Sequence, residues 1–251
     1  MTALNLALIA GAVVGLTLGA LGGGGSVLAV PALIYLLGFT PAAATTASLI
    51  IVTATSLTAL YAHARAGHVR WKAGTAFAAA GILPAAAAGT AATHMPQAVL
   101  TLAFAATAIL AAVHMFRPAD TGRPGSGDGD VRPGKAAGAG AGLGTLTGLL
   151  GVGGGFLAVP ALITVLAFEM EAAVGTSLLV ITVNSLASLA TRSGAAVSLD
   201  WALIGPFIAT AILGAWDGKR MAAKVSGPRL QRIFAVVLLA VAVFMLADAV
   251  T

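Results

Sequence analysis

The stretch GALGGGGSVLAVPALI, residues 19–34, places four consecutive glycines before a short apolar run that contains a proline. A second stretch, GLLGVGGGFLAVPALI at residues 148–163, has the same layout and ends in the same letters, LAVPALI. Glycine and proline are the two residues least compatible with a helix interior. Each stretch therefore predicts an interruption of helical structure inside a very hydrophobic chain, and the chain contains that interruption twice.

The composition around these stretches is that of an integral membrane protein. Of 251 residues, 59% are hydrophobic and 8% are charged, whereas soluble domains carry about 25% charged residues. No charged residue precedes Arg65, and further charge-free runs cover 136–168, 172–191, 201–216 and 233–247. Because about 20 helical residues cross a bilayer core, we expect an all-α membrane protein with roughly eight to ten helical segments, some too short to cross alone.

The charge of +5 would suggest nucleic acid in a soluble protein. Here the basic residues fall between apolar runs, so the lipid bilayer is the expected partner and nucleic acid is not. The absence of cysteine excludes disulfides and thiolate metal sites. The first apolar segment lacks a basic region before it, which favours a membrane helix over a cleaved signal peptide.

The glycine stretches belong to a longer internal repeat. Aligning Pro31 with Pro160, an offset of 129 residues, makes about half of the positions from 22 to 60 identical to their counterparts. One residue of slip later, Trp71 pairs with Trp201. We interpret the chain as two homologous membrane repeats, 1–116 and 136–251, joined by a Pro/Gly/Asp-rich cytoplasmic linker at 117–135.

Each repeat predicts five helical segments. They are 3–21, 27–38, 42–62, 73–92 and 97–116 in the first repeat, and 136–151, 156–168, 172–191, 201–216 and 233–250 in the second.

An odd number of crossings would invert the second repeat relative to the first, and the distribution of Lys and Arg tests this. The loop HARAGHVRWK contains Arg65, Arg70 and Lys72, whereas its counterpart in the second repeat contains only Arg192. The next loop, THMPQ, has no charged residue, but its counterpart DGKRMAAKVSGPRLQR is strongly basic. The bias reverses between equivalent loops, which predicts inverted repeats with both termini outside.

The short segments 27–38 and 156–168 suit half-helices or re-entrant elements, because irregular backbone survives inside a membrane only where protein or water satisfies it. A helix beginning near Ser26 or Gly155 presents free N–H groups and the positive end of its dipole, which favours an anion. Two inverted repeats would aim such ends at one another near the membrane midplane, as secondary transporters do. The alternative is that the glycines only allow close helix packing.

The third segment of each repeat adds hydroxyls and one amide that can donate hydrogen bonds to an oxyanion without fixed charge. Their alternative role is to bond neighbouring helices or the carbonyls of their own helix. The predicted substrate-binding residues are Gly24, Gly25, Ser26, Pro31, Ser48 and Thr55 in the first repeat, and Gly153, Gly154, Gly155, Pro160, Thr176, Ser177 and Asn184 in the second.

GGGGSVLAVPALI and GVGGGFLAVPALI, each followed by an A-x-x-x-S or GTSL helix start, resemble the sulfite exporter TauE/SafE family of bacterial membrane transporters. The resemblance covers essentially the whole chain. It implies a multi-pass protein of the bacterial inner membrane that transports small sulfur oxyanions, such as sulfite or organosulfonates. The first repeat has Ser26 opposite Gly155 and Ala47 opposite Thr176, so the two half-sites are not equivalent.

Potential-driven export is the expected mechanism, because about 100 mV contributes ~2.3 kcal/mol per elementary charge moved. No Lys or Arg lies inside the predicted apolar segments, so dipoles and hydroxyls would hold the anion. Proton coupling would need a titrating group, and the candidates are His63, His94, His114 and Asp217, which the sequence equally allows as solvated groups at segment ends.

The sequence lacks the motifs of an enzyme. No G-K-[ST] follows the glycines, and no His/Glu cluster has metal-ligand spacing, so neither a cofactor nor a metal is expected. The rival function is a non-transporting membrane subunit that binds a partner or scaffolds a complex. Whether the chain forms a homo-oligomer is left open.

Overall fold

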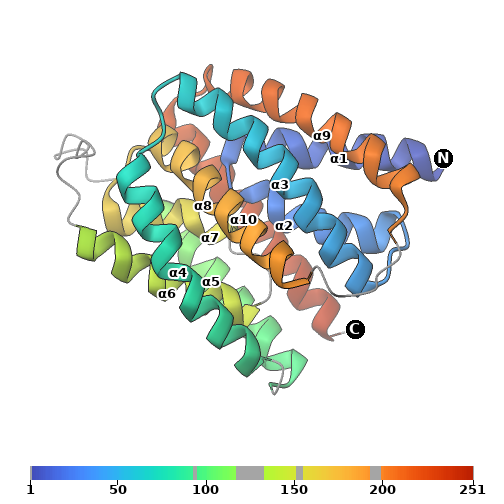
Figure 1. Cartoon of the computed structure of the whole chain (residues 1–251), viewed down its shortest axis with the longest axis horizontal. Coiled ribbons are helices and arrows are strands. Elements are labelled where there is room, and N and C mark those ends of the chain that lie inside the picture. The colour runs from blue at the N-terminus through green and yellow to red at the C-terminus, as the bar shows by residue number, and fades with distance from the viewer. Residues whose placement is uncertain (1, 93–94, 117–132, 151–154, 193–198, 251) are drawn as a thin grey trace.

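The computed structural model describes residues 2–92, 95–116, 133–150, 155–192 and 199–250 (Figure 1). All regular structure in these residues is helical. The elements are α1 (Ala3–Leu21), α2 (Gly24–Pro31), the π-helical segment η1 (Ala32–Leu36), α3 (Pro41–Arg65), α4 (Trp71–Ala92), α5 (Gln97–Phe116), α6 (Pro133–Leu150), α7 (Gly155–Leu166), α8 (Met170–Arg192), α9 (Trp201–Ala222) and α10 (Gly227–Val250).

Five of the described helices are long and apolar enough to cross a membrane. They cover Ala3–Leu21, Ala42–Arg65, Met170–Ala190, Trp201–Ala222 and Gly227–Phe244. Large apolar side chains also lie on the outside of the bundle, including Leu83 with 79% and Leu213 with 67% of its surface exposed. Such a surface suits a hydrocarbon environment, so the expectation of an all-α integral membrane protein is confirmed.

Helix boundaries follow the predicted segments except where charge interrupts a run of hydrophobic residues. Helices α1 and α5 have the predicted limits, but α9 continues to Ala222 beyond the predicted end at 216, and α10 begins at Gly227 rather than 233. Lys and Arg are good helix formers, so the ends of apolar runs were the wrong criterion for helix ends. Likewise α6 begins at Pro133, inside the predicted linker, because proline is favoured in a first helical turn; residues 117–132 lie outside the described part.

Helix packing follows the repeat in the sequence. Helix α1 packs along α9 and α4 packs along α6, while α3 packs against α8 and α5 against α10. Helices α1 and α6 are counterparts, as are α4 and α9, so the α1–α9 and α4–α6 interfaces are equivalent to one another. Two hydrophobic clusters each draw residues from both repeats, so the repeats pack around one another.

The two equivalent interfaces share the same close contacts. A Cβ atom at Gly15 would overlap the carbonyl oxygen of Ala211, and one at Gly144 would overlap that of Gly81. Gly15 and Gly144 are 129 residues apart, and Gly81 and Ala211 are 130 residues apart. The backbones of paired helices therefore approach so closely that only glycine fits, which is the packing that small residues allow in membranes.

The short helices of the two repeats also end alike. After η1, Gly38 has a φ of 69°, and after α7 the equivalent Ala167 has a φ of 53°. The N–H of Phe39 donates to Leu33 O at 3.0 Å, and the N–H of Phe168 donates to Leu162 O at 3.2 Å. These are the hydrogen bonds of a helix end closed by a left-handed residue.

Candidate functional site

The first glycine stretch separates two helices. Helix α1 ends at Leu21, Gly22 has a φ of +69° and its N–H donates to Leu18 O at 2.8 Å, and α2 begins at Gly24. The helix therefore begins two residues before Ser26, which had been expected at its start. In the second repeat α7 begins at Gly155, as expected; Gly153 and Gly154 lie outside the described residues.

The predicted glycines and prolines have different surroundings. A Cβ atom at Gly25 would overlap the Leu18 Cβ and lie 2.5 Å from Val14 O, so Gly25 permits α2 to pack on α1. Pro31 is the last residue of α2, half-buried, and the π-helical segment follows it, whereas Pro160 is buried inside α7. At Gly25, close packing explains the glycine without a ligand.

Three elements converge on Gly22. A Cβ atom there would overlap the Ser177 hydroxyl of α8, lie 3.2 Å from Val159 Cγ2 of α7, and lie 3.3 Å from Val174 O. The positive φ and the lack of space both require glycine. The helix interruption of the first repeat thus lies against Ser177, one of the predicted site residues of the second repeat.

The predicted hydroxyls donate to their own helices. Ser48 Oγ donates to Thr45 O at 2.8 Å, Thr55 Oγ1 to Ile51 O at 2.7 Å, and Ser177 Oγ to Val174 O at 2.8 Å. These are the local bonds that the alternative role describes. All three side chains are buried, so an anion would compete with the helix carbonyls for their protons.

Thr176 and Asn184 complete the predicted set. Thr176 is fully buried, and its Oγ1 accepts a hydrogen bond of 3.1 Å from the backbone N–H of Arg70 in the α3–α4 loop. It therefore acts as an acceptor that fixes a loop of the other repeat. Asn184 is half-buried on α8.

A buried hydroxyl pair between α3 and α8 was not among the predicted site residues. The hydroxyl oxygens of Ser56 and Thr182 lie 2.9 Å apart. Their repeat counterparts, Ser185 and Thr53, are also buried. The repeat alignment contained the signal, because both serines and both threonines are identical across the offset, but sequence spacing does not show that the two helices pack together.

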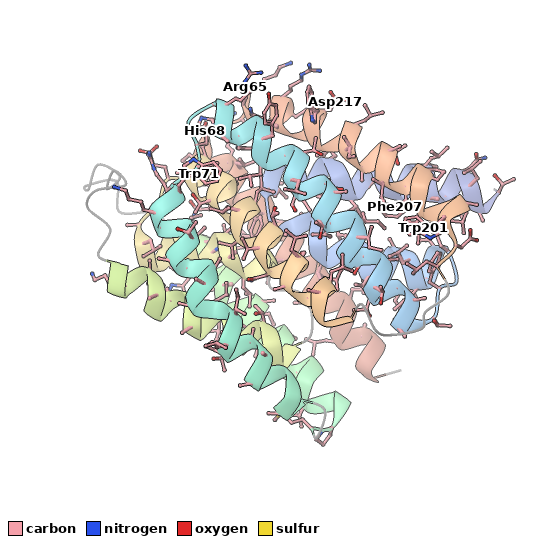
Figure 2. The ribbon with its side chains drawn as sticks, in the orientation of Figure 1. Arg65, His68, Trp71, Trp201, Phe207 and Asp217 are labelled. Atoms are coloured by element: carbon pink, nitrogen blue, oxygen red, sulfur yellow. The ribbon has the colours of Figure 1, made fainter. Side chains whose placement is uncertain are left out.

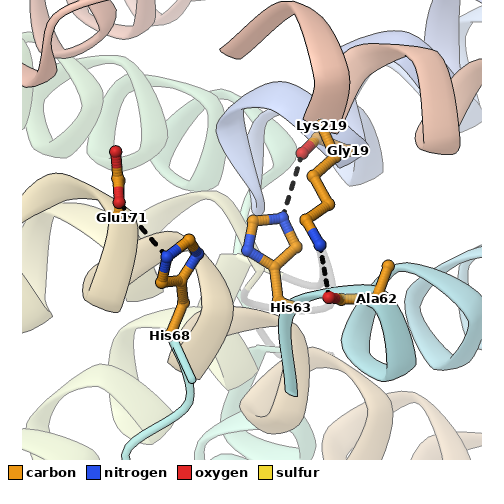
Figure 3. Close-up of polar contacts among 6 residues, drawn as sticks. All are labelled: Gly19, Ala62, His63, His68, Glu171 and Lys219. Carbon is orange, nitrogen blue, oxygen red and sulfur yellow. Dashed lines mark hydrogen bonds and ion pairs between the residues drawn. The ribbon is translucent and has the colours of Figure 1, made fainter. Parts of the chain in front are cut away.

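A second polar group lies where α1, α3 and α9 meet (Figure 3). His63 Nε2 lies 3.4 Å from Gly19 O, and the Lys219 ammonium donates to Ala62 O. His68 Nε2 lies 3.3 Å from a carboxylate oxygen of Glu171. Lys219 was missed because the predicted segment ended at 216, although α9 continues and brings its amine to α3.

The proposed proton-coupling candidates separate into different environments. His63 is buried, whereas His114 is exposed at the end of α5 and Asp217 forms an exposed 3.4 Å pair with Arg220. His94 lies outside the described residues. In the part of the chain that the structure describes, no group of three or more His, Asp or Glu side chains is arranged to hold a metal.

Basic residues gather at the end of the molecule that holds His63. Figure 2 shows Arg65, His68 and Asp217 along one edge, with Trp201 well away from them. The C-terminal ends of α3 and α9 meet there, because Lys219 reaches Ala62. The arrangement is a polar, basic end above an apolar bundle whose interior is lined by hydroxyls and glycine backbone.

Comparison with known proteins agrees with this architecture. Residues 7–245 match the family described as Sulfite exporter TauE/SafE. Two relatives from Xylella fastidiosa, strains 9a5c and Temecula1, are both described as a probable membrane transporter protein; they are 34% and 33% identical over 242 residues, which is 94% of this chain and 92% of each relative. No solved structure matches the chain. The chain therefore belongs to the sulfite exporter TauE/SafE family and is a multi-pass bacterial membrane transporter.

Proposed function

We propose that this transporter exports small sulfur oxyanions, such as sulfite or organosulfonates, and holds them between its two glycine-rich helix interruptions. The observation that carries the proposal is the contact of Gly22 with Ser177. It places the interruption of one repeat against a hydroxyl-bearing helix of the other, at the start of α2. Free N–H groups at such a start, with the dipole of the helix, favour an anion.

The inverted arrangement of the repeats supports a site between them. Helix α9 ends beside the C-terminal end of α3, since Lys219 contacts Ala62, and α4 begins six residues after α3 ends. Helices α4 and α9 are repeat counterparts, and they run in opposite directions in Figure 1. We take the basic end as cytoplasmic, following the preference of Lys and Arg for that side.

Uncharged coordination suits release as well as binding. Ser177, Thr55 and Asn184 carry no fixed charge, and the nearest described ammonium group in the sequence of events is Lys219 at the basic end. An anion entering from the cytoplasm would meet the positive end first and then the hydroxyls. A membrane potential of about 100 mV then drives a monovalent anion outward with ~2.3 kcal/mol.

The experiment is anion flux in proteoliposomes. Radiolabelled sulfite, methanesulfonate, thiosulfate and acetate are loaded, and efflux is followed for wild type, Ser177→Ala, and the control Thr145→Ala, whose threonine is exposed on α6. We expect efflux of sulfur oxyanions that Ser177→Ala reduces strongly and Thr145→Ala leaves unchanged. If wild type moves none of these anions, a scaffold function replaces transport; if Ser177→Ala matches wild type, the site is wrong.

A further inference from the structure

Two buried nitrogen atoms at the basic end have no partner. Among the described residues, the buried side-chain polar atoms without a hydrogen bond are His63 Nδ1 and His68 Nδ1. The two rings are centred 5.8 Å apart. Figure 3 shows these unbonded nitrogens turned toward one another, each on the side of its ring opposite the bonded Nε2.

The partners of the two Nε2 atoms determine which nitrogen carries the hydrogen. A backbone carbonyl and a carboxylate can only accept hydrogen bonds, so Gly19 O and Glu171 favour a hydrogen on the Nε2 of His63 and of His68. In a neutral ring the other nitrogen is then a bare lone pair. Two lone pairs thus face one another in a buried position, and an unpaired buried acceptor costs free energy.

We propose that His63 and His68 form a proton-binding site in which the two Nδ1 atoms share one proton, and that this proton promotes anion passage. The proton converts one acceptor into a donor, so that each Nδ1 gains its missing partner in a single N–H···N bond. The site itself stands on the two rings alone. Its effect on passage rests on the proposed transport function.

The charges around the pair come from each neighbouring element. Helix α8 supplies Glu171 against His68, and α9 supplies Lys219, which is close enough to interact electrostatically with His63. These two charges offset one another, so an added proton leaves the entrance with one more positive charge. The other charged groups point elsewhere or lie further along the chain: Arg65 lies over the Tyr61 ring, Asp217 and Arg220 pair with each other, Arg70 and Lys72 lie in the loop and at the start of α4, and α1 contributes only the Gly19 carbonyl.

The pair also joins the two elements that meet at Gly22. His63 contacts Gly19 O, three residues before the helix interruption. The backbone oxygen of His68 lies 2.6 Å from where a Cβ atom of Gly175 would be, and Arg70 N–H bonds Thr176, the residue before Ser177. A proton shared by the rings therefore ties the end of α1, through His63, to the turn of α8 that carries Ser177.

The direction of the effect follows from charge. A proton on the pair attracts an anion to the entrance and neutralises one negative charge if it accompanies the anion. We therefore expect anion flux to rise as the pH at the basic end falls across the range in which histidine titrates, between about pH 5 and 8.

The first measurement tests the proton site without any anion. Histidine-selective isotope labelling and NMR of the full chain in nanodiscs follow the protonation of His63 and His68 against pH, in wild type, His63→Asn and His68→Asn. If the rings share a proton, removing either one changes the proton concentration at which the other titrates by about tenfold or more. Independent titration of the two rings, as with a bridging water, would overturn the site.

The second measurement tests control of transport. Efflux of radiolabelled methanesulfonate, an anion whose charge is constant over this range, is measured in proteoliposomes at several pH values. Wild type should show a several-fold rise as pH falls, His63→Asn and His68→Asn should lose that rise, and His114→Asn, with an exposed histidine, should keep it. Because His68 is partly exposed in a loop, His68→Asn remains informative if His63→Asn fails to fold.

The two measurements distinguish the failures. Coupled titration without any wild-type efflux contradicts the proposed transport function and leaves the proton site standing. Coupled titration with an unchanged pH profile in both asparagine variants contradicts the control of passage.

Discussion

Gly22 and Ser177 occupy one position in space from opposite repeats: no Cβ atom fits at Gly22 without overlapping the Ser177 hydroxyl. This contact joins the C-terminal end of α1 to the second turn of α8. It also brings the interruption before α2 to the helix that supplies most of the predicted polar groups of the second repeat. The proposed anion site is built around it.

The contact predicts a large effect of a small substitution. Gly22→Ala must both adopt a positive φ, which costs about 1–2 kcal/mol for an L-residue, and displace Ser177, which adds an overpacking cost of about 1–3 kcal/mol. Gly38→Ala is a matched control, because Gly38 has the same φ of 69° but no atom within 4 Å of the added Cβ. Thermal stability of the detergent-solubilised protein should fall clearly more for Gly22→Ala; equal losses would show that the contact is absent.

The helix end at Ala167 predicts a stabilising substitution. Ala167 has a φ of 53°, in the region where its repeat counterpart is Gly38. Ala167→Gly removes the strain of the left-handed conformation, offset by the greater freedom of glycine in the unfolded chain, for a net gain of about 0.5–1 kcal/mol. The measurement is the thermal midpoint, and a decrease would mean that the positive φ is not the strained feature of this turn.

Close packing of α4 and α6 predicts opposite effects for two glycines on one helix. Gly144→Ala forces a methyl group into the Gly81 backbone, whereas Gly142 has open space at its Cβ position. We expect Gly144→Ala to destabilise the protein by about 1–3 kcal/mol and Gly142→Ala to stabilise it by up to about 1 kcal/mol, since alanine favours a helix. Unfolding in a denaturing detergent measures both, and similar effects would contradict the interface.

The inverted arrangement predicts the sides of two loops. A reporter enzyme fused after Met95 should lie outside the cell, and one fused after Lys224 should lie in the cytoplasm. Position 95 precedes α5 and position 224 precedes α10, which are repeat counterparts. Reporters on the same side would exclude inverted repeats.

Much of the fold could be predicted from the sequence because apolar runs and the repeat both report on it. The limits of α1 and α5 coincide with the ends of uncharged runs. The ends of α9 and α10 do not, since Lys219 and Arg229 lie inside helices. Hydropathy describes the hydrocarbon layer, whereas a helix continues past that layer until its backbone is capped.

The site was less predictable, because its contacts join residues far apart in the sequence. Residue spacing placed Ser48 and Thr55 on one face of a helix but gave no sign that their hydroxyls bond that helix. Gly22 was passed over in favour of Gly24 and Gly25, since four glycines in a row do not reveal which one has the positive φ. The His63–His68 pair depends on a loop that turns back over α8, which no periodic pattern encodes.

The most direct test of the anion site uses the absence of cysteine from the chain. Ser177→Cys is treated with a small anionic methanethiosulfonate reagent in proteoliposomes, with and without methanesulfonate, and Ser226→Cys, exposed between α9 and α10, serves as the matched control. The account predicts that the thiol at position 177 is labelled and that methanesulfonate slows its labelling, while labelling at position 226 is unaffected. A thiol at position 177 that is never labelled, or is labelled at the same rate with the anion present, would contradict an anion site at this contact.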